Sequence, residues 1–337
     1  MDSKIQLIKE NKVIGYLVAT ALLVGLIYFA DVGKFLQALE QVDRFYMFLA
    51  IISGMSFYLV MGYIWFSFFR NIGINANLWK SYRLFMAGNF MNSVTPLGQL
   101  GGEPFMAYII SKNTNSNYQE AFSAVASSDL INSIPFITYT ALSVIYLYFT
   151  GGISGPIENI IYLVIVLGTL LGLTAYLLWS GNKKMNKLGH KILNQIENKA
   201  LKKKHTELIR EKLEEFRKSF RRAGEDKKHL LKVALVAHIF PLTQFLALYL
   251  ILLGMNINPE LISIFFVVIL SGLAMFSPTP GGSGTFEAAF SGLMILFYPE
   301  VALSTALATA VLFRLTTYWP GIPIGYLCLI SLRGERE

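Results

Sequence analysis

The sequence Thr-Pro-Leu-Gly-Gln-Leu-Gly-Gly-Glu at residues 95–103 has a second, altered copy, Thr-Pro-Gly-Gly-Ser-Gly-Thr-Phe-Glu, at residues 279–287. Threonine, proline, the fourth-position glycine and the final glutamate occupy the same places in both copies. Each copy interrupts an otherwise apolar stretch of the chain. A helix-breaking, acidic segment is costly in lipid unless it lines a cavity that the protein encloses. Two such interruptions at corresponding positions of two halves indicate the binding site of a membrane transporter.

The composition is that of an integral membrane protein. Hydrophobic residues make up 54% of the 337 residues, whereas charged residues make up only 15%. Uncharged runs at 13–30, 45–69 and 159–182 reach or nearly reach the roughly 20 residues that span a hydrocarbon core. The single cysteine, Cys328, and four scattered histidines offer no disulfide framework and no spacing of metal ligands. We therefore predict an all-α, polytopic membrane protein without a metal or cofactor.

Basic residues are concentrated in one part of the chain. Residues 183–232 contain seventeen of the 29 Lys and Arg residues. Because basic loops remain in the cytoplasm, residues 181–229 are predicted to form a cytoplasmic basic helical loop. With this loop inside, both termini are cytoplasmic in a multi-pass protein of the cell membrane. Six full spans then follow, near residues 13–30, 45–69, 120–149, 157–179, 230–253 and 301–331.

The basic loop has two interpretations. Its apolar residues recur at helical spacing among Lys and Arg, which suits a helix pair lying on an anionic inner leaflet. Alternatively, it is a solvated helical hairpin that only fixes the topology. Binding of nucleic acid is not expected, because the block is tethered between membrane spans and has few aromatic residues.

Two further apolar stretches, 81–112 and 260–299, are each interrupted by one copy of the motif. The interruptions leave arms too short to cross the membrane: residues 81–94 would make about 21 Å of helix against a core of roughly 30 Å. We predict that each stretch is a re-entrant hairpin and that the two hairpins enter from opposite faces. The fold is then an inverted-topology repeat of residues 45–149 and 230–331.

A second correspondence extends this repeat. Asp129 and Pro135 in repeat one match Arg314 and Pro320 in repeat two, at nearly the same offset as the motif. The alternative is coincidence among common glycine and proline residues. Order and spacing match over both the hairpin and the helix that follows it, which favours a true repeat.

The two motifs carry the candidate binding residues. Their prolines and glycines end the entering arm and permit turns that other residues cannot adopt. The returning arms would begin near Glu103 and Thr285, so two helix N-termini, which attract phosphate, would face each other at mid-membrane. The alternative is that the glycines only allow close helix packing. The predicted substrate-binding residues are Thr95, Gly98, Gly101, Gly102, Glu103, Asp129, Thr279, Gly281, Gly282, Gly284, Glu287 and Arg314.

The charged residues of this set leave several roles open. Glu103 and Glu287 either cap their own helix starts, or titrate and couple movement to protons, or pair with a cationic headgroup. Asp129 and Arg314 are expected to meet each other or the hairpin tips, because an unpaired charge in the membrane is expensive. They form either a static ion pair or part of the substrate site, and the planar guanidinium of Arg314 suits phosphate.

These motifs give the chain a resemblance to a known family. With Thr-Pro-Leu-Gly-Gln-Leu-Gly-Gly-Glu-Pro at 95–104 and Pro-Thr-Pro-Gly-Gly-Ser-Gly-Thr-Phe-Glu at 278–287, it resembles the flippase-like transmembrane domain of the lysylphosphatidylglycerol synthetase family over residues 10–332. In two-part members of that family, a soluble domain transfers lysine from aminoacyl-tRNA to lipid. No such domain is expected here, so the resemblance implies lipid translocation rather than synthesis. The site residues that it implies are Glu103 and Glu287 with their glycine-rich turns, backed by Asp129 and Arg314.

No nucleophile elbow, Walker loop, zincin motif or dinucleotide fingerprint is present in the sequence, so we expect neither an enzyme nor an ATP-driven pump. The sequence predicts a lipid flippase or scramblase, in which a headgroup crosses a polar cavity between the hairpins. The expected partners are membrane lipids, either an anionic phospholipid or a polyprenyl-phosphate-linked substrate, and a homo-oligomer is compatible with the sequence. The alternatives are a membrane-embedded transferase, with Glu103 or Glu287 as general base, and an accessory protein in lipid or lipid-linked sugar modification.

Overall fold

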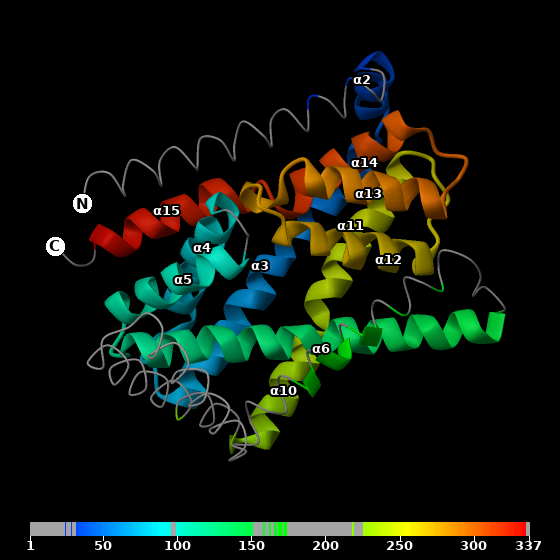
Figure 1. Ribbon diagram of the computed structural model, residues 1–337. Coiled ribbons are helices and arrows are strands. Elements are labelled where there is room, and N and C mark those ends of the chain that lie inside the picture. The colour runs from blue at the N-terminus through cyan, green and yellow to red at the C-terminus, as the bar shows by residue number, and fades with distance from the viewer. Residues whose placement is uncertain are drawn as a thin grey trace, which may run out of the picture. The chain divides into compact units, whose positions relative to one another are not determined.

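The computed structural model describes residues 32–95, 99–150 and 225–334, together with single positions at 24, 28, 158, 162, 165, 166, 168–170, 172, 173 and 218. Within these residues every regular element is an α-helix or a 3-10 helix, and none is a strand (Figure 1). The all-α membrane fold predicted from the composition is therefore confirmed. Gly98 lies outside the described residues, as do most of the predicted spans 13–30 and 157–179 and of the basic loop 181–229.

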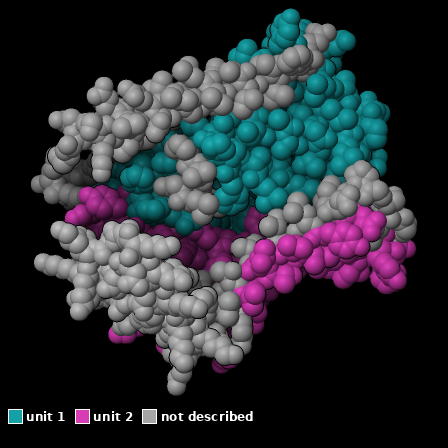
Figure 2. Space-filling model, viewed as in Figure 1, with its two compact units in different colours: residues 1–63, 82–106, 239–337 teal, residues 64–81, 107–238 magenta. Residues whose placement is uncertain are grey.

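The chain divides into two compact units, coloured separately in Figure 2. Unit 1 comprises residues 1–63, 82–106 and 239–337. Unit 2 comprises residues 64–81 and 107–238. Both motif copies belong to unit 1, so this unit contains the candidate site.

Among the described residues, three helical segments are long and apolar enough to cross a membrane. A helix pairs its backbone N–H and C=O groups internally, and its uncharged side chains can face lipid, as a membrane span requires. They agree with three of the predicted spans, at 45–69, 120–149 and 230–253. The helices are α3 (Arg44–Ile72), α6 (Tyr118–Thr150) and the consecutive α10 (Lys227–Ala237) and α11 (Ile239–Gly254).

The second motif lies at the turn of a helical hairpin, as predicted for residues 260–299. The entering arm is α12 (Leu261–Leu273), and the returning arm is α13 (Thr285–Phe297). Each arm has 13 residues, which corresponds to about 20 Å of helix and is too short to cross a bilayer. The arms pack against each other, and Phe266 stacks on Phe297 with ring centroids 5.6 Å apart.

The turn between these arms depends on glycine. Two short 3-10 helices, η1 (Ala274–Phe276) and η2 (Pro280–Gly282), replace regular helix between α12 and α13. Gly281, Gly282 and Gly284 have φ angles of 55°, 68° and 81°. Side chains with a Cβ rarely adopt these angles, so the glycines of this motif are required by the backbone.

The first motif also connects two packed helices, α4 (Leu78–Val94) and α5 (Gln99–Asn113). A Cβ on Gly88 of α4 would lie 2.6 Å from Met106 of α5, and a Cβ on Gly102 would lie 2.8 Å from the Cα atom of Asn92. The two arms are therefore antiparallel and in close contact on their glycine faces. The entry of the two hairpins from opposite membrane faces stays a prediction.

The predicted single helix at 301–331 is wrong in one respect, because the structure has two helices there. α14 (Leu303–Thr317) and α15 (Gly321–Gly334) are separated by Tyr318, Trp319 and Pro320. Proline has no backbone N–H and so cannot continue the ladder of hydrogen bonds. Its counterpart Pro135 lies inside the uninterrupted helix α6, so the two prolines are not equivalent in structure.

The core of unit 1 lies among α11, α12, α13 and α14, which pack against one another. Phe290 on α13 is fully buried and lies 5.4 Å, between ring centroids, from Phe313 on α14. Helix α2 (Val32–Glu40) covers another face of α14 through its buried Phe35 and Ala38. In unit 2, α10 packs against α6. The second hairpin is thus held by apolar packing on both arms.

Substitution of Gly102 by Ala tests the contact between the arms of the first hairpin. Its Cβ would overlap Asn92, so α4 and α5 would have to separate. We expect a loss of about 1–3 kcal/mol in the free energy of unfolding, measured by thermal unfolding of the purified protein in detergent. The matched control is Gly292→Ala on α13, where a Cβ meets nothing within 4 Å. Equal unfolding temperatures for the two variants would contradict the predicted packing.

Candidate functional site

Two opposite charges meet in the core of unit 1. Glu287 lies in the first turn of α13, and Arg314 lies in the last turn of α14. The Arg314 Nη1 atom is 3.3 Å from the Glu287 Oε1 atom, and the two side chains are 1% and 2% exposed. Neither charge is hydrated there, so each depends on the other and on nearby dipoles. This ion pair is the centre of the candidate site.

Glu287 also caps its own helix. Its Oε2 atom accepts a 2.7 Å hydrogen bond from the backbone N–H of Gly284, the residue before α13. A glutamate at the third helical position satisfies a free backbone donor at the helix start in this way. The partial positive charge of that helix end also stabilises the carboxylate. Of the roles predicted for Glu287, capping is the one that the geometry displays.

Arg314 is held from three further sides. Its Nη2 atom donates a 2.9 Å hydrogen bond to the carbonyl oxygen of Gly281 in the hairpin turn. Its guanidinium carbon lies 3.9 Å from the ring centroid of Tyr318 and 5.1 Å from that of Phe286, which are cation–π distances. Within the described parts of the chain, the Nε and Nη1 atoms donate no hydrogen bond. The guanidinium therefore retains donor capacity.

The two motifs adjoin at this point. The Tyr318 hydroxyl donates a 3.3 Å hydrogen bond to the carbonyl oxygen of Ser93, at the end of α4. A Cβ on Gly281 would lie 3.0 Å from the same carbonyl oxygen and would overlap the Tyr318 hydroxyl. Ser93 precedes Thr95, the first residue of the first motif, by two positions. The turn of the second hairpin thus contacts the end of the first hairpin's entering arm.

The break between α14 and α15 is stabilised by a tyrosine from α3. Interruption of a helix leaves carbonyl oxygens without their usual N–H partners. The Tyr58 hydroxyl is 2.7 Å from the carbonyl oxygen of Thr317 and 3.2 Å from that of Tyr318. Tyr58 is almost completely buried, so this hydroxyl is a fixed part of the break.

The break separates a helix on one hairpin from a helix on the other. α14 packs along α13 of the second hairpin. α15 packs on α4 of the first hairpin, where a Cβ on Gly325 would overlap Met86 and where the rings of Phe90 and Tyr326 are 5.5 Å apart. Arg314 and Tyr318 therefore lie where the chain passes from α14, which packs on the second hairpin, to α15, which packs on the first.

The first motif does not reproduce the geometry of the second. α5 begins at Gln99, so Glu103 is its fifth residue and lies beyond the first turn, half-buried. Thr95 is buried, and its hydroxyl donates to the carbonyl oxygen of Met91 within α4. Gly102 packs against Asn92. The backbone of Gly101 lies within α5, as the third residue of that helix. Capping by Glu103 in the manner of Glu287 is therefore not observed.

Asp129 lies on α6 in unit 2, half-buried and next to the buried Ser127 and Ser128. Asn132 donates a 3.3 Å hydrogen bond to the hydroxyl of Ser128 on the same helix. The ion-pair partner of Arg314 in the structure is Glu287, and the predicted contact between Asp129 and Arg314 stays a prediction. Among the described residues, His, Cys, Asp and Glu side chains nowhere gather in threes, so no transition-metal ligand set occurs there.

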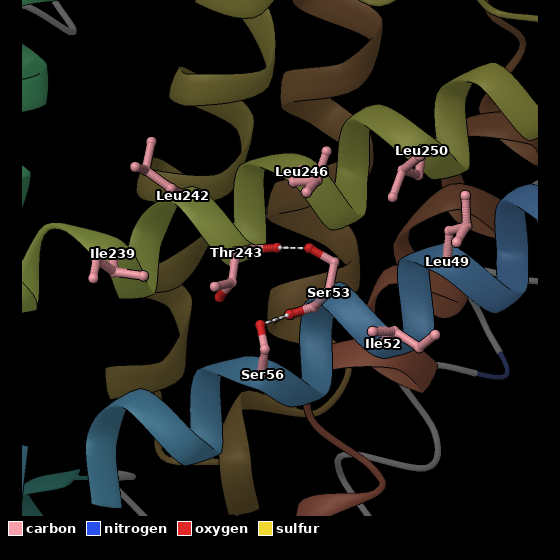
Figure 3. A pocket seen from close by; sticks show the side chains of 9 residues that line it. All are labelled: Leu49, Ile52, Ser53, Ser56, Ile239, Leu242, Thr243, Leu246 and Leu250. Carbon is pink, nitrogen blue, oxygen red and sulfur yellow. Dashed lines mark hydrogen bonds between the residues drawn. The ribbon is translucent and has the colours of Figure 1, made fainter. Parts of the chain in front are cut away.

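A separate groove of about 570 Å³ lies between α3 and α11 in unit 1 (Figure 3). Leucine and isoleucine side chains form most of its wall. The Ser53 hydroxyl donates to the carbonyl oxygen of Thr243, and the Ser56 hydroxyl donates to that of Ser53. Since these hydroxyls are satisfied by backbone, the groove presents hydrocarbon and is suited to lipid chains rather than to a charged headgroup.

Sequence reasoning missed Tyr58 and the carbonyl of Ser93 as parts of this site. Tyr58 lies in an apolar run more than 250 residues before its partners, and no motif marks it. The available signal was Pro320, because a proline inside an apolar helix leaves carbonyls that need a donor. That signal shows the need for a donor but does not identify it.

Substitution of Glu287 by Gln tests the ion pair. The variant keeps the shape of the side chain but leaves the buried charge of Arg314 without its counter-charge. Removal of one partner of a buried pair costs about 3–5 kcal/mol, so we expect a clearly lower thermal unfolding temperature in detergent. Glu300→Gln, at an exposed residue after α13, is the matched control and should unfold like the wild type. The same unfolding temperature for both variants would show that the pair does not stabilise the fold.

The sequence of this chain is similar to those of a known family of membrane proteins. Residues 13–325 match the family described as the lysylphosphatidylglycerol synthase TM region. A UPF0104 membrane protein of Pyrococcus horikoshii is 24% identical over 324 residues, covering 94% of this chain and 96% of the relative. UPF0104 membrane proteins of Methanothermobacter thermautotrophicus and Methanocaldococcus jannaschii are also each 24% identical, over 322 and 324 residues. These two alignments cover 92% and 93% of this chain, and 92% of each relative.

The matched residues 13–325 contain both hairpins, the helical break and the two residues of the buried ion pair. The three relatives are membrane proteins that align over almost their whole length. A family match over most of the chain assigns the chain to that family. This chain is a membrane protein of the lysylphosphatidylglycerol synthase transmembrane-region family.

Proposed function

We propose that this protein moves the phosphate-bearing headgroup of a lipid between the leaflets of the cell membrane without changing it covalently. The substrate would be an anionic phospholipid or a polyprenyl-phosphate-linked lipid. Membership of a family named for a lipid synthase supports a lipid substrate. The observation that carries the proposal is the buried guanidinium of Arg314 at the junction of the two hairpins.

Arg314 has the chemistry that a phosphate requires. The planar guanidinium donates hydrogen bonds in a fork that matches phosphate oxygens. Two of its nitrogen atoms, Nε and Nη1, donate no hydrogen bond within the described ranges. An anionic oxygen arriving at these donors would complete the hydrogen bonding of the side chain. Binding would thus offset the loss of hydration of the phosphate.

Glu287 gives Arg314 a partner in the absence of substrate. The 3.3 Å pair keeps the cation stable in an apolar core between transport events. A phosphate would compete with the Glu287 carboxylate for Nη1, while Oε2 remains bonded to Gly284. On this exchange the phosphate would become the counter-charge of Arg314, and the Gly284 N–H and the start of α13 would remain as the stabilising groups of the Glu287 carboxylate.

The helical break supports movement at this place. α14 packs on the second hairpin and α15 packs on the first, so a change in the angle at Tyr318–Pro320 would move one hairpin relative to the other. Alternating access in transporters arises from such displacement of one bundle against another around a fixed site.

The transferase alternative is less well supported by the geometry of Glu287. A general base needs a carboxylate oxygen that is available to the proton it removes. Both oxygens of Glu287 are engaged, one by Gly284 and the other by Arg314. Use of this residue as a base would therefore require the helix cap or the ion pair to open.

Arg314→Lys tests the proposal in vesicles that contain purified protein and a fluorescently labelled phospholipid. Lysine keeps the charge that Glu287 needs but lacks the planar fork, so we expect the rate of lipid movement to fall by roughly tenfold or more. The rate is measured by quenching of the label in the outer leaflet. Arg70→Lys, at an exposed residue near the end of α3, is the matched control and should retain the wild-type rate.

The substrate arms of this experiment are labelled phosphatidylglycerol and a labelled polyprenyl phosphate, and the faster one identifies the lipid class. Size-exclusion chromatography checks that Arg314→Lys remains folded. A wild-type rate in a folded Arg314→Lys protein would refute the role of Arg314. Detection of a covalently changed lipid by mass spectrometry would favour the transferase.

A further inference from the structure

The groove between α3 and α11 has a floor of small side chains and a rim of large apolar ones (Figure 3). Ser53, Ser56 and Thr243 form the floor, and Ser53 is only 8% exposed. The rim side chains are larger, and four of them are 46–52% exposed. A cavity of about 570 Å³ therefore remains open where two membrane-spanning helices meet. The rim consists of Leu49, Ile52, Ile239, Leu242, Leu246 and Leu250.

The spacing of these residues makes the groove run along the helices. On α11 the lining residues recur at spacings of three or four from Ile239 to Leu250, which places them in one stripe. On α3 they recur in the same way from Leu49 to Ser56. The eleven positions from Ile239 to Leu250 correspond to about 16 Å of helix, close to half of the roughly 30 Å hydrocarbon core. The groove therefore has the length of one leaflet.

The groove lies in one half of the membrane. The Asp43 N–H donates a 2.8 Å hydrogen bond to the carbonyl oxygen of Gly254, so the start of α3 and the end of α11 lie at the same level. Leu49 lies five residues after the start of α3 at Arg44, and Ser56 lies twelve residues after it. These positions correspond to about 8 Å and about 18 Å along the helix. Because the charged Asp43 and Arg44 mark the end that faces water, the groove extends from one surface to about the middle of the bilayer.

The polar atoms of the floor are already hydrogen-bonded. The hydroxyls of Ser53, Ser56 and Thr243 donate to backbone carbonyl oxygens at 2.8, 2.6 and 2.7 Å. None of the residues that line the groove is charged. A headgroup or a peptide backbone in the groove would lose its hydration without gaining hydrogen bonds, which is unfavourable. The groove therefore suits a hydrocarbon chain.

We propose that the groove binds one acyl chain of a phospholipid in the leaflet next to the start of α3. The chain lies extended between the rims, with its terminal methyl group near Ser56 and its ester end near Leu49. Lipid tails are as apolar as leucine, so binding depends on packing, because an unfilled slot leaves the rim side chains without contacts on one side. An acyl chain has the length of one leaflet, whereas a polyprenyl chain is much longer and would leave most of its length outside the groove.

The groove and the helical break use different faces of α3. A Cβ on Gly54 would lie 2.5 Å from the carbonyl oxygen of Thr316, and the Tyr58 hydroxyl is 2.7 Å from that of Thr317. These two residues of α3 therefore face the break, whereas the serines of α3 that line the groove face α11. Binding of a chain in the groove is thus independent of the movement of a headgroup at the ion pair.

The test is photolabelling of the full-length protein in vesicles that contain phosphatidylglycerol with a diazirine on one acyl chain. One probe carries the diazirine at the terminal end of the chain, and a second probe carries it next to the ester. We expect the terminal probe to label the inner end of the groove, at Ser56 and Ile239. The ester-proximal probe should label the outer end, at Leu49 and Leu250. The labelled residues are identified by mass spectrometry of peptides.

Exposed residues of α6 provide the background of ordinary contact with lipid. Leu142 and Ile145 are 56% and 53% exposed and lie outside the groove. We expect the groove residues to be labelled roughly tenfold more than these two, because a bound chain stays in place whereas bulk lipid exchanges.

Ser56→Leu fills the inner end of the groove and should reduce labelling there by the terminal probe by roughly tenfold. Ser331→Leu is the matched control, because the Ser331 hydroxyl also donates to the carbonyl oxygen three residues before it but lies outside the groove. This control should be labelled like the wild type. Thr243→Leu serves as a second blocking variant if size-exclusion chromatography shows that Ser56→Leu does not fold.

Equal labelling of the groove and of the α6 residues would refute the site, as would the same labelling pattern from both probes. Full labelling in a folded blocking variant would refute it as well. An unlabelled groove in a protein that light scattering shows to be a dimer would identify a second copy as the occupant and overturn the proposal. Groove labelling in vesicles without lipid movement would support the acyl-chain site and refute transport, whereas lipid movement with an unlabelled groove would refute the acyl-chain site alone.

Discussion

The ion pair between Glu287 and Arg314 is the interaction on which the arrangement of the second hairpin depends. Two charges that are about 99% and 98% buried in an apolar bundle are tolerated only if every neighbouring dipole favours them. The N-terminus of α13 and the N–H of Gly284 favour the carboxylate, and the carbonyl of Gly281 and the ring of Tyr318 favour the guanidinium. The glycine-rich turn, the helix start and the end of α14 are thus fixed together.

The break at Tyr318–Pro320 comes directly after the helix that carries Arg314. A continuous helix would pass the hairpin turn with all its carbonyls bonded internally, but Pro320 cannot donate to the preceding turn. The Tyr58 hydroxyl donates to the carbonyl oxygen of Thr317 in the break, and the break lets α14 pack on one hairpin and α15 on the other. The break thus lies beside the buried charge of Arg314, the turn of the second hairpin and the end of α4.

The duplicated motif predicted two hairpins correctly but overstated their likeness. The short apolar stretches on either side of Pro and Gly correctly predicted the helix pairs α4–α5 and α12–α13. Helix length and helix breakers are local properties of the sequence. Residues at equivalent motif positions nevertheless have different structural roles. Glu287 falls in the first turn of its helix, whereas Glu103 falls in the second, since α5 begins two motif positions earlier than α13. The hydroxyl of Thr285 contacts that of Ser277, whereas a glycine, Gly101, occupies the corresponding position of the first motif.

The sequence by itself determined the membrane character, the long helices and the two hairpin turns, because these depend on the length of apolar runs and on residues that break helices. It also determined that Arg314 needs a partner, since a charge in this composition cannot remain uncompensated. Only the tertiary structure decided that the partner is Glu287, that Tyr58 closes the break and that Ser93 meets Tyr318. These contacts join residues 27 to 260 positions apart, and their choice depends on how helices pack, which no local pattern specifies.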